Sequence, residues 1–300
     1  MLTGTVRVIS STNSRPTVRG QMSTFDSTKT LLGELLAKVV KGKLQLPDFQ
    51  RGWVWDDEHI QSLLVSIARS FPIGAVMLLE TGGETRFQVR PVEGVELPSN
   101  TNPEELILDG QQRLTSLTQV LKLDKPVATR DAKKRELKRH YYFDIEKALQ
   151  SGPEALGEAI VAVDEHRTQR ENFGREVTLD LTTREKEIES FHFPCSQILN
   201  SDDWEQALSE FAPAKLARFM KLRKLVVEPL RNSALSVIRL KKETSKGGRL
   251  PRLREGEHGW RAALGLRADH RDVGGRGLQS SRRLVWRTGQ ERASSWRLSR

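Results

Sequence analysis

Apolar and polar residues repeat along the chain with two different periods, one typical of helices and one typical of strands. Helical spacing predicts a helix that Asp26 or Ser27 caps and Gly42 ends, and a second helix over residues 57–69 with Asp56 as its N-cap. Short apolar runs predict strands at residues 44–46, 75–79, 106–108, 140–145, 159–163 and 235–240. This mixture predicts an α+β fold, a small mixed sheet with helices packed on it.

The segments between these elements are mostly polar. Residues 124–138 carry alternating charges and are expected to be a connector with a solvated face, and residues 167–175 are expected to be a loop. Further expected elements are a short strand at residues 87–89, a segment packed on the core at 192–199, a helix over 204–211 capped by Asp202 or Asp203, and a longer helix over 214–227.

The strand at residues 106–108 runs directly into Asp109-Gly110-Gln111-Gln112-Arg113, and an amphipathic run follows. This order predicts a strand, a tight loop and a helix N-terminus. Backbone N–H groups and the helix dipole favour an anion at such a loop, Gly110 allows close approach, and the Arg113 guanidinium fits a phosphate. Gln111 and Gln112 can orient a water or hold a base or sugar. Asp109 can hold a metal-bound water or accept a proton.

A purely structural interpretation of this loop remains open, because Asp-Gly after a strand is often a turn followed by a capped helix. A second polar pair, Gln50 and Arg51, lies among aromatic residues. Trp53 and Trp55 are expected to anchor the helix that follows them. Arg51 is harder to interpret structurally, since a charge among aromatic side chains needs a partner.

The single cysteine and the distribution of charge limit the possible classes of protein. Cys195 excludes an internal disulfide framework, suits a reducing cytoplasm and is expected to be a buried thiol. No apolar run approaches a membrane span and no signal-peptide pattern begins the chain, so a cytoplasmic protein without a membrane partner is expected. The net charge is +10, but residues 1–246 hold 36 basic and 34 acidic residues. The basic excess therefore lies in the C-terminal tail.

Four motifs occur in an order that resembles the DUF262 family, the N-terminal domain of GmrSD-type modification-dependent restriction enzymes. They are LPDFQRGWVW, FPIGAVMLLE, LILDGQQRLTSL and HYYFDIEKAL, and the resemblance runs from about residue 29 to about residue 240. The order of parts is also similar to that of the wider ParB/sulfiredoxin superfamily, which implies a ParB/sulfiredoxin-like fold. Sulfiredoxins place a cysteine where this chain has Asp109-Gly110-Gln111-Gln112, so sulfiredoxin chemistry is excluded.

The resemblance implies binding and hydrolysis of a nucleoside triphosphate, which would gate cleavage of modified foreign DNA by a nuclease domain or subunit. It implies that Gln50, Arg51 and Gly110 line the nucleotide pocket and that Arg113 holds the phosphates. The hypothesis assigns water positioning to Gln111 or Gln112 and binding of Mg²⁺ to Asp109. No nuclease site is visible in the sequence. A non-catalytic ParB-like DNA-binding module is the alternative, and the near-neutral domain slightly disfavours it.

Both ends of the chain differ from the part between them. Residues 1–25 are polar and expected to be disordered, and the domain is expected to span residues 26–246 and to be incomplete at its C-terminal end. Residues 247–300 are Arg-rich and free of Lys, which is typical of a disordered tail that contacts nucleic acid.

The sharper hypothesis for the tail is a frameshift near Lys246. Codons permitted for residues 248–286, read one base later, give a sequence that begins AVCLVFEKVNT and resembles the family's next motif, FEKVNTGG. The tail would then be out-of-frame translation and no argument for DNA binding. In that case the chain would lack the last helices of its domain and any nuclease domain, and an inactive fragment becomes a third possibility.

Overall fold

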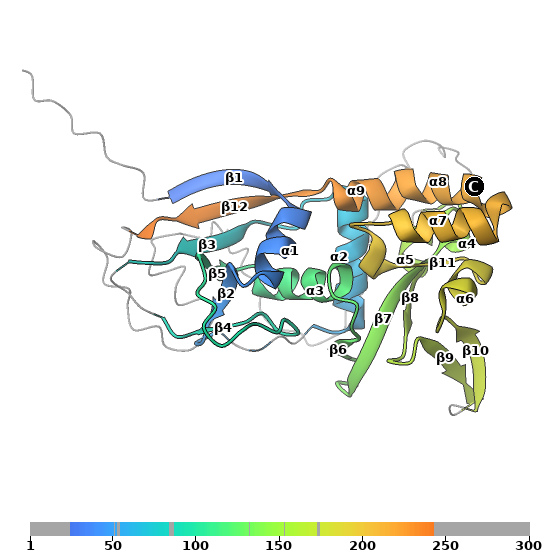
Figure 1. Cartoon of the computed structure of the whole chain (residues 1–300), viewed down its shortest axis with the longest axis horizontal. Helices are drawn as coiled ribbons and strands as arrows, with labels where there is room; N and C mark the ends of the chain where they lie inside the picture. The colour runs from blue at the N-terminus through green and yellow to red at the C-terminus, as the bar shows by residue number, and fades with distance from the viewer. Residues whose placement is uncertain are drawn as a thin grey trace, which may run out of the picture.

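The computed structural model of the chain describes residues 25–242, except residues 51, 53–54, 84–86, 132, 153 and 173–174. The expected N-terminal disorder lies outside the described residues, apart from Phe25, and so do the Arg-rich tail and the proposed frameshift position. Figure 1 shows a larger sheet on the left, a smaller sheet at the lower right and most of the helices between or above them. This arrangement confirms the predicted α+β class.

The larger sheet is mixed and has six strands in the described part of the chain, in the order β1-β12-β3-β5-β2-β4. Its strands are β1 (Phe25–Leu31), β12 (Ala234–Leu240), β3 (Val76–Glu80), β5 (Glu105–Asp109), β2 (Leu44–Pro47) and β4 (Val89–Arg90). The pairs β12 with β3 and β2 with β5 are parallel, and the other pairs are antiparallel. All six of the predicted apolar runs contribute to strands of this sheet or of the smaller sheet.

The smaller sheet is built around one long strand, β7 (Glu136–Asp144). Its antiparallel neighbours are β6 (Val127–Arg130), β8 (Ile160–Val163) and β11 (His192–Pro194). A separate two-stranded ribbon, β9 (Thr168–Glu171) with β10 (Glu176–Asp180), lies beyond this sheet at the lower right of Figure 1.

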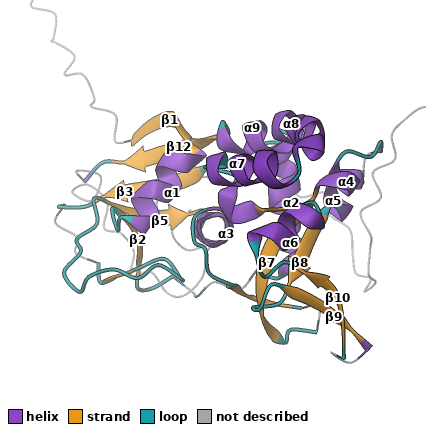
Figure 2. Cartoon of the chain, turned by 45° about the vertical axis from the view of Figure 1, so that its right-hand side comes forward, coloured by secondary structure: helices purple, strands orange, loops and turns teal. Residues whose placement is uncertain are grey.

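The helices connect the two sheets and cover them, as Figure 2 shows from a second side. They are α1 (Leu32–Val40), α2 (Asp57–Ala68), α3 (Gln111–Leu121), α4 (Ile145–Ala148), α5 (Ala155–Glu158), α6 (Arg184–Glu189), α7 (Asp202–Phe211), α8 (Leu216–Leu222) and α9 (Glu228–Arg231). Asp56 caps α2 as predicted, since its side chain accepts a hydrogen bond from the His59 backbone N–H at 3.0 Å. Among the described residues, no helix has the length and apolar character needed to cross a membrane.

The expectation that Asp26 or Ser27 caps the first helix is wrong. Residues 25–31 form strand β1, which pairs antiparallel with β12 from Phe25↔Leu240 to Leu31↔Ala234, and α1 begins only at Leu32. The apolar stripe within residues 32–39 does belong to the helix. The residues before it instead form backbone hydrogen bonds with β12, a strand from the other end of the domain. Such distant pairing overrides local propensity.

Two segments expected to lack regular structure form strands instead. The charged connector at residues 124–138 contains β6 and the start of β7, paired from Val127↔Arg139 to Arg130↔Glu136. In β6, Val127 and Thr129 are buried while Ala128 is exposed, a strand alternation hidden among the charges. The predicted loop at 167–175 contains β9, which is stabilised by pairing with β10.

The C-terminal helical part departs from prediction in two details. Ser201, rather than Asp202 or Asp203, stands at the N-cap of α7, and both aspartates lie in its first turn. The predicted helix over 214–227 consists of a short 3-10 turn, η3 (Pro213–Lys215), then α8 and a π-helical turn, η4 (Arg223–Val227). Pro229 in α9 has no N–H to donate, and the wider π turn directly before it is where the ladder changes, with Glu228 N–H bonded to the Arg223 carbonyl.

An aromatic cluster anchors this helical part to the smaller sheet. Phe193 on β11, Trp204 on α7 and Phe219 on α8 are fully buried, with ring centroids 4.8–5.3 Å apart. Cys195, in the 3-10 turn η2 (Cys195–Gln197), is also fully buried, which confirms the expected buried thiol and raises its pKa. Residues 192–199 thus pack on the core as expected.

A carboxylate is buried between the smaller sheet and α6. Glu187 is 2% exposed, accepts a hydrogen bond from the Tyr142 hydroxyl at 3.2 Å and lies 3.1 Å from the Arg184 guanidinium. Arg167 lies 3.6 Å away on the other side. Loss of hydration nevertheless dominates and raises the pKa of Glu187 to about 7.

The raised pKa predicts a pH-dependent stability. Between about pH 4.5 and 7 the folded state retains a proton that the unfolded state releases, so the free energy of unfolding falls as the pH rises through this range. Relative to Glu187→Gln, which does not titrate, the wild-type chain should lose up to about 3 kcal/mol between pH 4.5 and pH 8. Urea unfolding of both proteins at several pH values measures this difference. Parallel stability–pH curves would contradict it.

Candidate functional site

Three loops meet at one edge of the larger sheet. Strands β2 and β5 are parallel neighbours, with Leu44 opposite Glu105 and Gln45 opposite Leu106, so both chains leave the sheet at the same edge. Strand β3 runs the other way and begins there, with Met77 opposite Asp109. The edge beyond the carboxyl ends of parallel strands is a common place for ligand sites. The loops after β2 and β5 and the turn before β3 therefore form the candidate site.

Gly110 makes the sharp connection from β5 to α3. Its φ of +87° lies in the left-handed region, which residues with a Cβ disfavour. A Cβ at this position would lie 3.1 Å from the Val76 Cγ2 and 3.3 Å from an Arg113 guanidinium nitrogen. The helix begins directly afterwards, with Leu114 N–H bonded to the Gly110 carbonyl at 2.9 Å. The predicted order of strand, tight loop and helix N-terminus is confirmed.

Arg113 points from the first turn of α3 toward the turn before β3. Its guanidinium donates to the backbone carbonyls of Ile73 and Ala75, at 2.9 Å for Ala75, and lies 3.6 Å from the Asp109 carboxylate. Its side chain is 19% exposed and that of Asp109 is 32% exposed. The guanidinium therefore stabilises the packing of this turn against the helix. The Asp109–Arg113 pair is nevertheless partly exposed to solvent.

Gln50 joins the loop after β2 to the end of β5. Its side-chain amide donates to the carbonyls of Ile107 at 2.7 Å and Leu108 at 3.1 Å, and its own backbone carbonyl accepts from Arg90 at 3.2 Å. The Gln50 Oε1 is buried and has no hydrogen-bond partner among the described residues. A donor from an ordered water or from a ligand can satisfy such an acceptor. Arg51, the next residue, lies outside the described residues.

The two glutamines of the motif are nearly buried at the start of α3. Gln111 and Gln112 are each 8% exposed, and the Gln112 side chain donates to the Gly52 carbonyl at 3.3 Å. This contact ties the loop after β2 to the helix. The structure thus gathers Gln50 and the whole segment from Asp109 to Arg113 at one sheet edge.

The candidate site offers a metal ion one carboxylate, that of Asp109. Within the described residues, no three His, Cys, Asp or Glu side chains form a cluster able to hold a metal ion. Asp109 can supply one carboxylate, and Mg²⁺ in nucleotide sites is commonly held by one or two carboxylates together with phosphates and waters. The donor set therefore suits a metal that arrives with a nucleotide rather than a resident ion.

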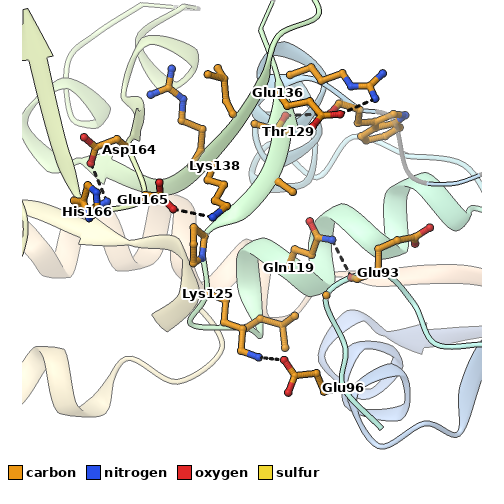
Figure 3. Close-up of a pocket in the computed structure, with 18 residues that line it drawn as sticks. Glu93, Glu96, Gln119, Lys125, Thr129, Glu136, Lys138, Asp164, Glu165 and His166 are labelled. Carbon is orange, nitrogen blue, oxygen red and sulfur yellow. Dashed lines mark hydrogen bonds and ion pairs between the residues drawn. The ribbon is translucent and has the colours of Figure 1, made fainter. Parts of the chain in front are cut away.

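A large cavity lies at the other end of α3, where no motif in the sequence predicts a site. A cavity of about 870 Å³ lies between the last turns of α3, the loop at residues 93–96 and the β6–β7 hairpin (Figure 3). Trp55 and Gln119 line it, and none of the sequence-predicted site residues does. Its lining comes from four separate segments that carry no shared motif, so no local signal in the sequence identifies it.

The close packing around Gly110 predicts a measurable cost of adding a side chain. Gly110→Ala should lower the free energy of unfolding by about 1–2 kcal/mol from the left-handed backbone alone, with a further loss from crowding of Val76 and Arg113. Gly82→Ala is the matched control, since Gly82 has the same φ of +87° but nothing within 4 Å of an added Cβ. Urea denaturation should show the larger loss for Gly110→Ala, and equal losses would refute the close packing.

Comparison with known proteins identifies the family. The model of the GmrSD restriction endonuclease N-terminal domain matches residues 32–246, which include all the described elements after β1 up to β12. An uncharacterized protein of Methanocaldococcus jannaschii is 40% identical over 101 residues, a segment that covers 32% of this chain and 17% of that protein. The chain therefore spans only a small part of that relative. The family match covers most of the chain, and the chain belongs to the GmrSD restriction endonuclease N-terminal domain family.

Proposed function

We propose that this chain is a nucleotide-binding and nucleotide-hydrolysing domain that regulates a DNA restriction system. The observation that carries the proposal is the junction of β5 and α3. There a left-handed glycine, the Asp109–Arg113 pair and a helix N-terminus lie at the carboxyl edge of two parallel strands. Such an arrangement suits an anionic ligand, because the helix dipole and the guanidinium both favour negative charge.

In this proposal, catalysis relies on positioning and charge stabilisation. Arg113 and the N-terminal turn of α3 bind the phosphates, and the carbonyl contacts that hold the Arg113 guanidinium also fix its orientation. Gln111 or Gln112 positions the attacking water. The buried Gln50 Oε1 accepts a hydrogen bond from the base or sugar.

Mg²⁺ fits this proposal as a companion of the nucleotide. Asp109 would hold the ion, and the ion would neutralise charge on the phosphates. The other residues bind and orient the ligand without it.

The restriction context defines what such a domain would control. Membership of the restriction family suggests that nucleotide turnover gates cleavage of modified foreign DNA. The nuclease activity would come from another domain or subunit of the restriction system.

Removal of the Asp109 carboxylate tests the metal role. Asp109→Asn keeps the size of the side chain and should lower kcat for Mg²⁺-dependent NTP hydrolysis on the order of 100-fold. It should also raise the Mg²⁺ concentration needed for half-maximal rate. Asp203→Asn on the exposed first turn of α7 is the control and should have the parental rate. Phosphate release measured across a Mg²⁺ titration gives both quantities, and parental kinetics in Asp109→Asn would exclude the role.

Removal of the Arg113 guanidinium tests the phosphate role. Arg113→Ala should reduce NTP turnover about 1000-fold, because the charge opposite the phosphates is lost. It should also lower thermal stability, since the carbonyls of Ile73 and Ala75 lose their donor. Arg218→Ala, which removes an exposed arginine on α8, is the control. A folded Arg113→Ala protein that hydrolyses NTP at the parental rate would overturn the assignment, and salt-dependent DNA binding without any NTP turnover would favour the DNA-binding alternative.

A further inference from the structure

The cavity beside α3, here called the hairpin cavity, is enclosed by the loop at residues 93–96, the end of α3 and the β6–β7 hairpin. At about 870 Å³ it falls within the size range of small-molecule sites. The apolar part of its lining, here called the floor, includes Trp55, Leu123 and Pro126. A flat ring could rest on such a floor, and an indole favours stacking with one.

The rim of the hairpin cavity is charged, but its charges are already paired. Figure 3 shows Lys125 with Glu96 at 2.6 Å and Lys138 with Glu165 at 2.9 Å on neighbouring sides of the cavity. The remaining charged lining residues in the described chain, His166 aside, also have partners. These are Arg130 with Glu136, Arg139 with Asp57, Glu93 with Arg90, and Asp164 with Arg170.

Paired charges disfavour an ionic ligand. The lining contains four basic and five acidic side chains, so it offers an anion no net attraction. A phosphate or a carboxylate would also have to compete with the carboxylates that already pair with the basic groups, which costs free energy. An uncharged ligand avoids this cost. Its donors and acceptors can still bond to the paired side chains, because carboxylates and ammonium groups alternate around the rim.

The wall of the hairpin cavity also contains a side-chain amide, that of Gln119, whose oxygen accepts no hydrogen bond from the described residues. Gln119, which is 6% exposed, donates from its Nε2 to the Glu93 carbonyl at 2.8 Å, while its Oε1 is buried without a hydrogen-bond partner among the described residues. The terminal torsion of a glutamine amide is soft. A small rotation would present Oε1 to an N–H or O–H group of a bound ligand.

We propose that the hairpin cavity binds an uncharged nucleoside. A nucleobase has flat faces that can pack on the apolar floor. Its N–H groups can donate a hydrogen bond to the Gln119 Oε1, which has no other donor among the described residues. The other donors and acceptors on its edge can bond to the charged side chains of the rim. The absence of a phosphate distinguishes this ligand from the nucleotide expected at the DGQQR motif. The site is therefore a second one, on the opposite end of α3.

Calorimetric titration of the full 300-residue chain with adenosine, guanosine, cytidine and uridine tests the proposal, with the corresponding monophosphates as charge controls. At least one nucleoside should bind, and about 10-fold more tightly than its monophosphate. Ala128→Trp, which fills the cavity from an exposed position on β6, should weaken binding by about 10-fold or more. Thr178→Trp on exposed β10 should leave it unchanged.

Circular dichroism establishes that each variant is folded. If Ala128→Trp does not fold, Glu136→Trp introduces the same bulk from the neighbouring strand, where the Glu136 side chain is 85% exposed. Absence of nucleoside binding at millimolar concentration would overturn the proposal. So would a monophosphate that binds as tightly as its nucleoside and is weakened equally by Ala128→Trp, because binding at the DGQQR motif would not respond to that substitution. A nucleoside that binds Ala128→Trp and Thr178→Trp equally well occupies the DGQQR site or another surface, and this too would overturn it.

Discussion

Strands β2 and β5 leave the larger sheet side by side, and the candidate site depends on this parallel pairing. The pairing brings the loop after β2 next to the loop after β5, although the two are far apart in the chain. The Gln50 side chain then joins them by donating to the carbonyls of Ile107 and Leu108. Because those carbonyls belong to residues near the end of β5, the bonds also fix the position of Asp109, the last residue of the strand before Gly110.

Arg113, at the same place, both stabilises the fold and borders the candidate site. Its guanidinium holds the turn before β3 through two backbone carbonyls, so the side chain enters the site with its orientation already restricted. Restriction of this kind lowers the entropy lost when a ligand binds. A phosphate would share the guanidinium with these carbonyls, and five N–H donors allow such sharing.

Helix α3 carries two different electrostatic environments at its two ends. Its first turn, with Arg113 and the positive end of the helix dipole, favours an anion. Its last turns face the hairpin cavity, where the lysines and arginines of the lining form ion pairs with carboxylates. The same helix thus lies between the site proposed for a charged ligand and the cavity proposed for an uncharged one. The Gly52 carbonyl accepts a hydrogen bond from Gln112 at the first, and the Trp55 carbonyl accepts one from Thr129 beside the second.

The amino-acid sequence by itself determined the elements whose energetics are local. The cap at Asp56, the tight loop at Gly110 and the helix that follows it depend on residues within a few positions, and residue type and spacing predicted each of them. Only the tertiary structure decided that residues 25–31 are a strand, that Arg113 bonds to the turn before β3, and that four segments enclose a cavity. These features arise from backbone and side-chain pairing between distant segments, and local periodicity contains no information about which distant partner a segment will meet.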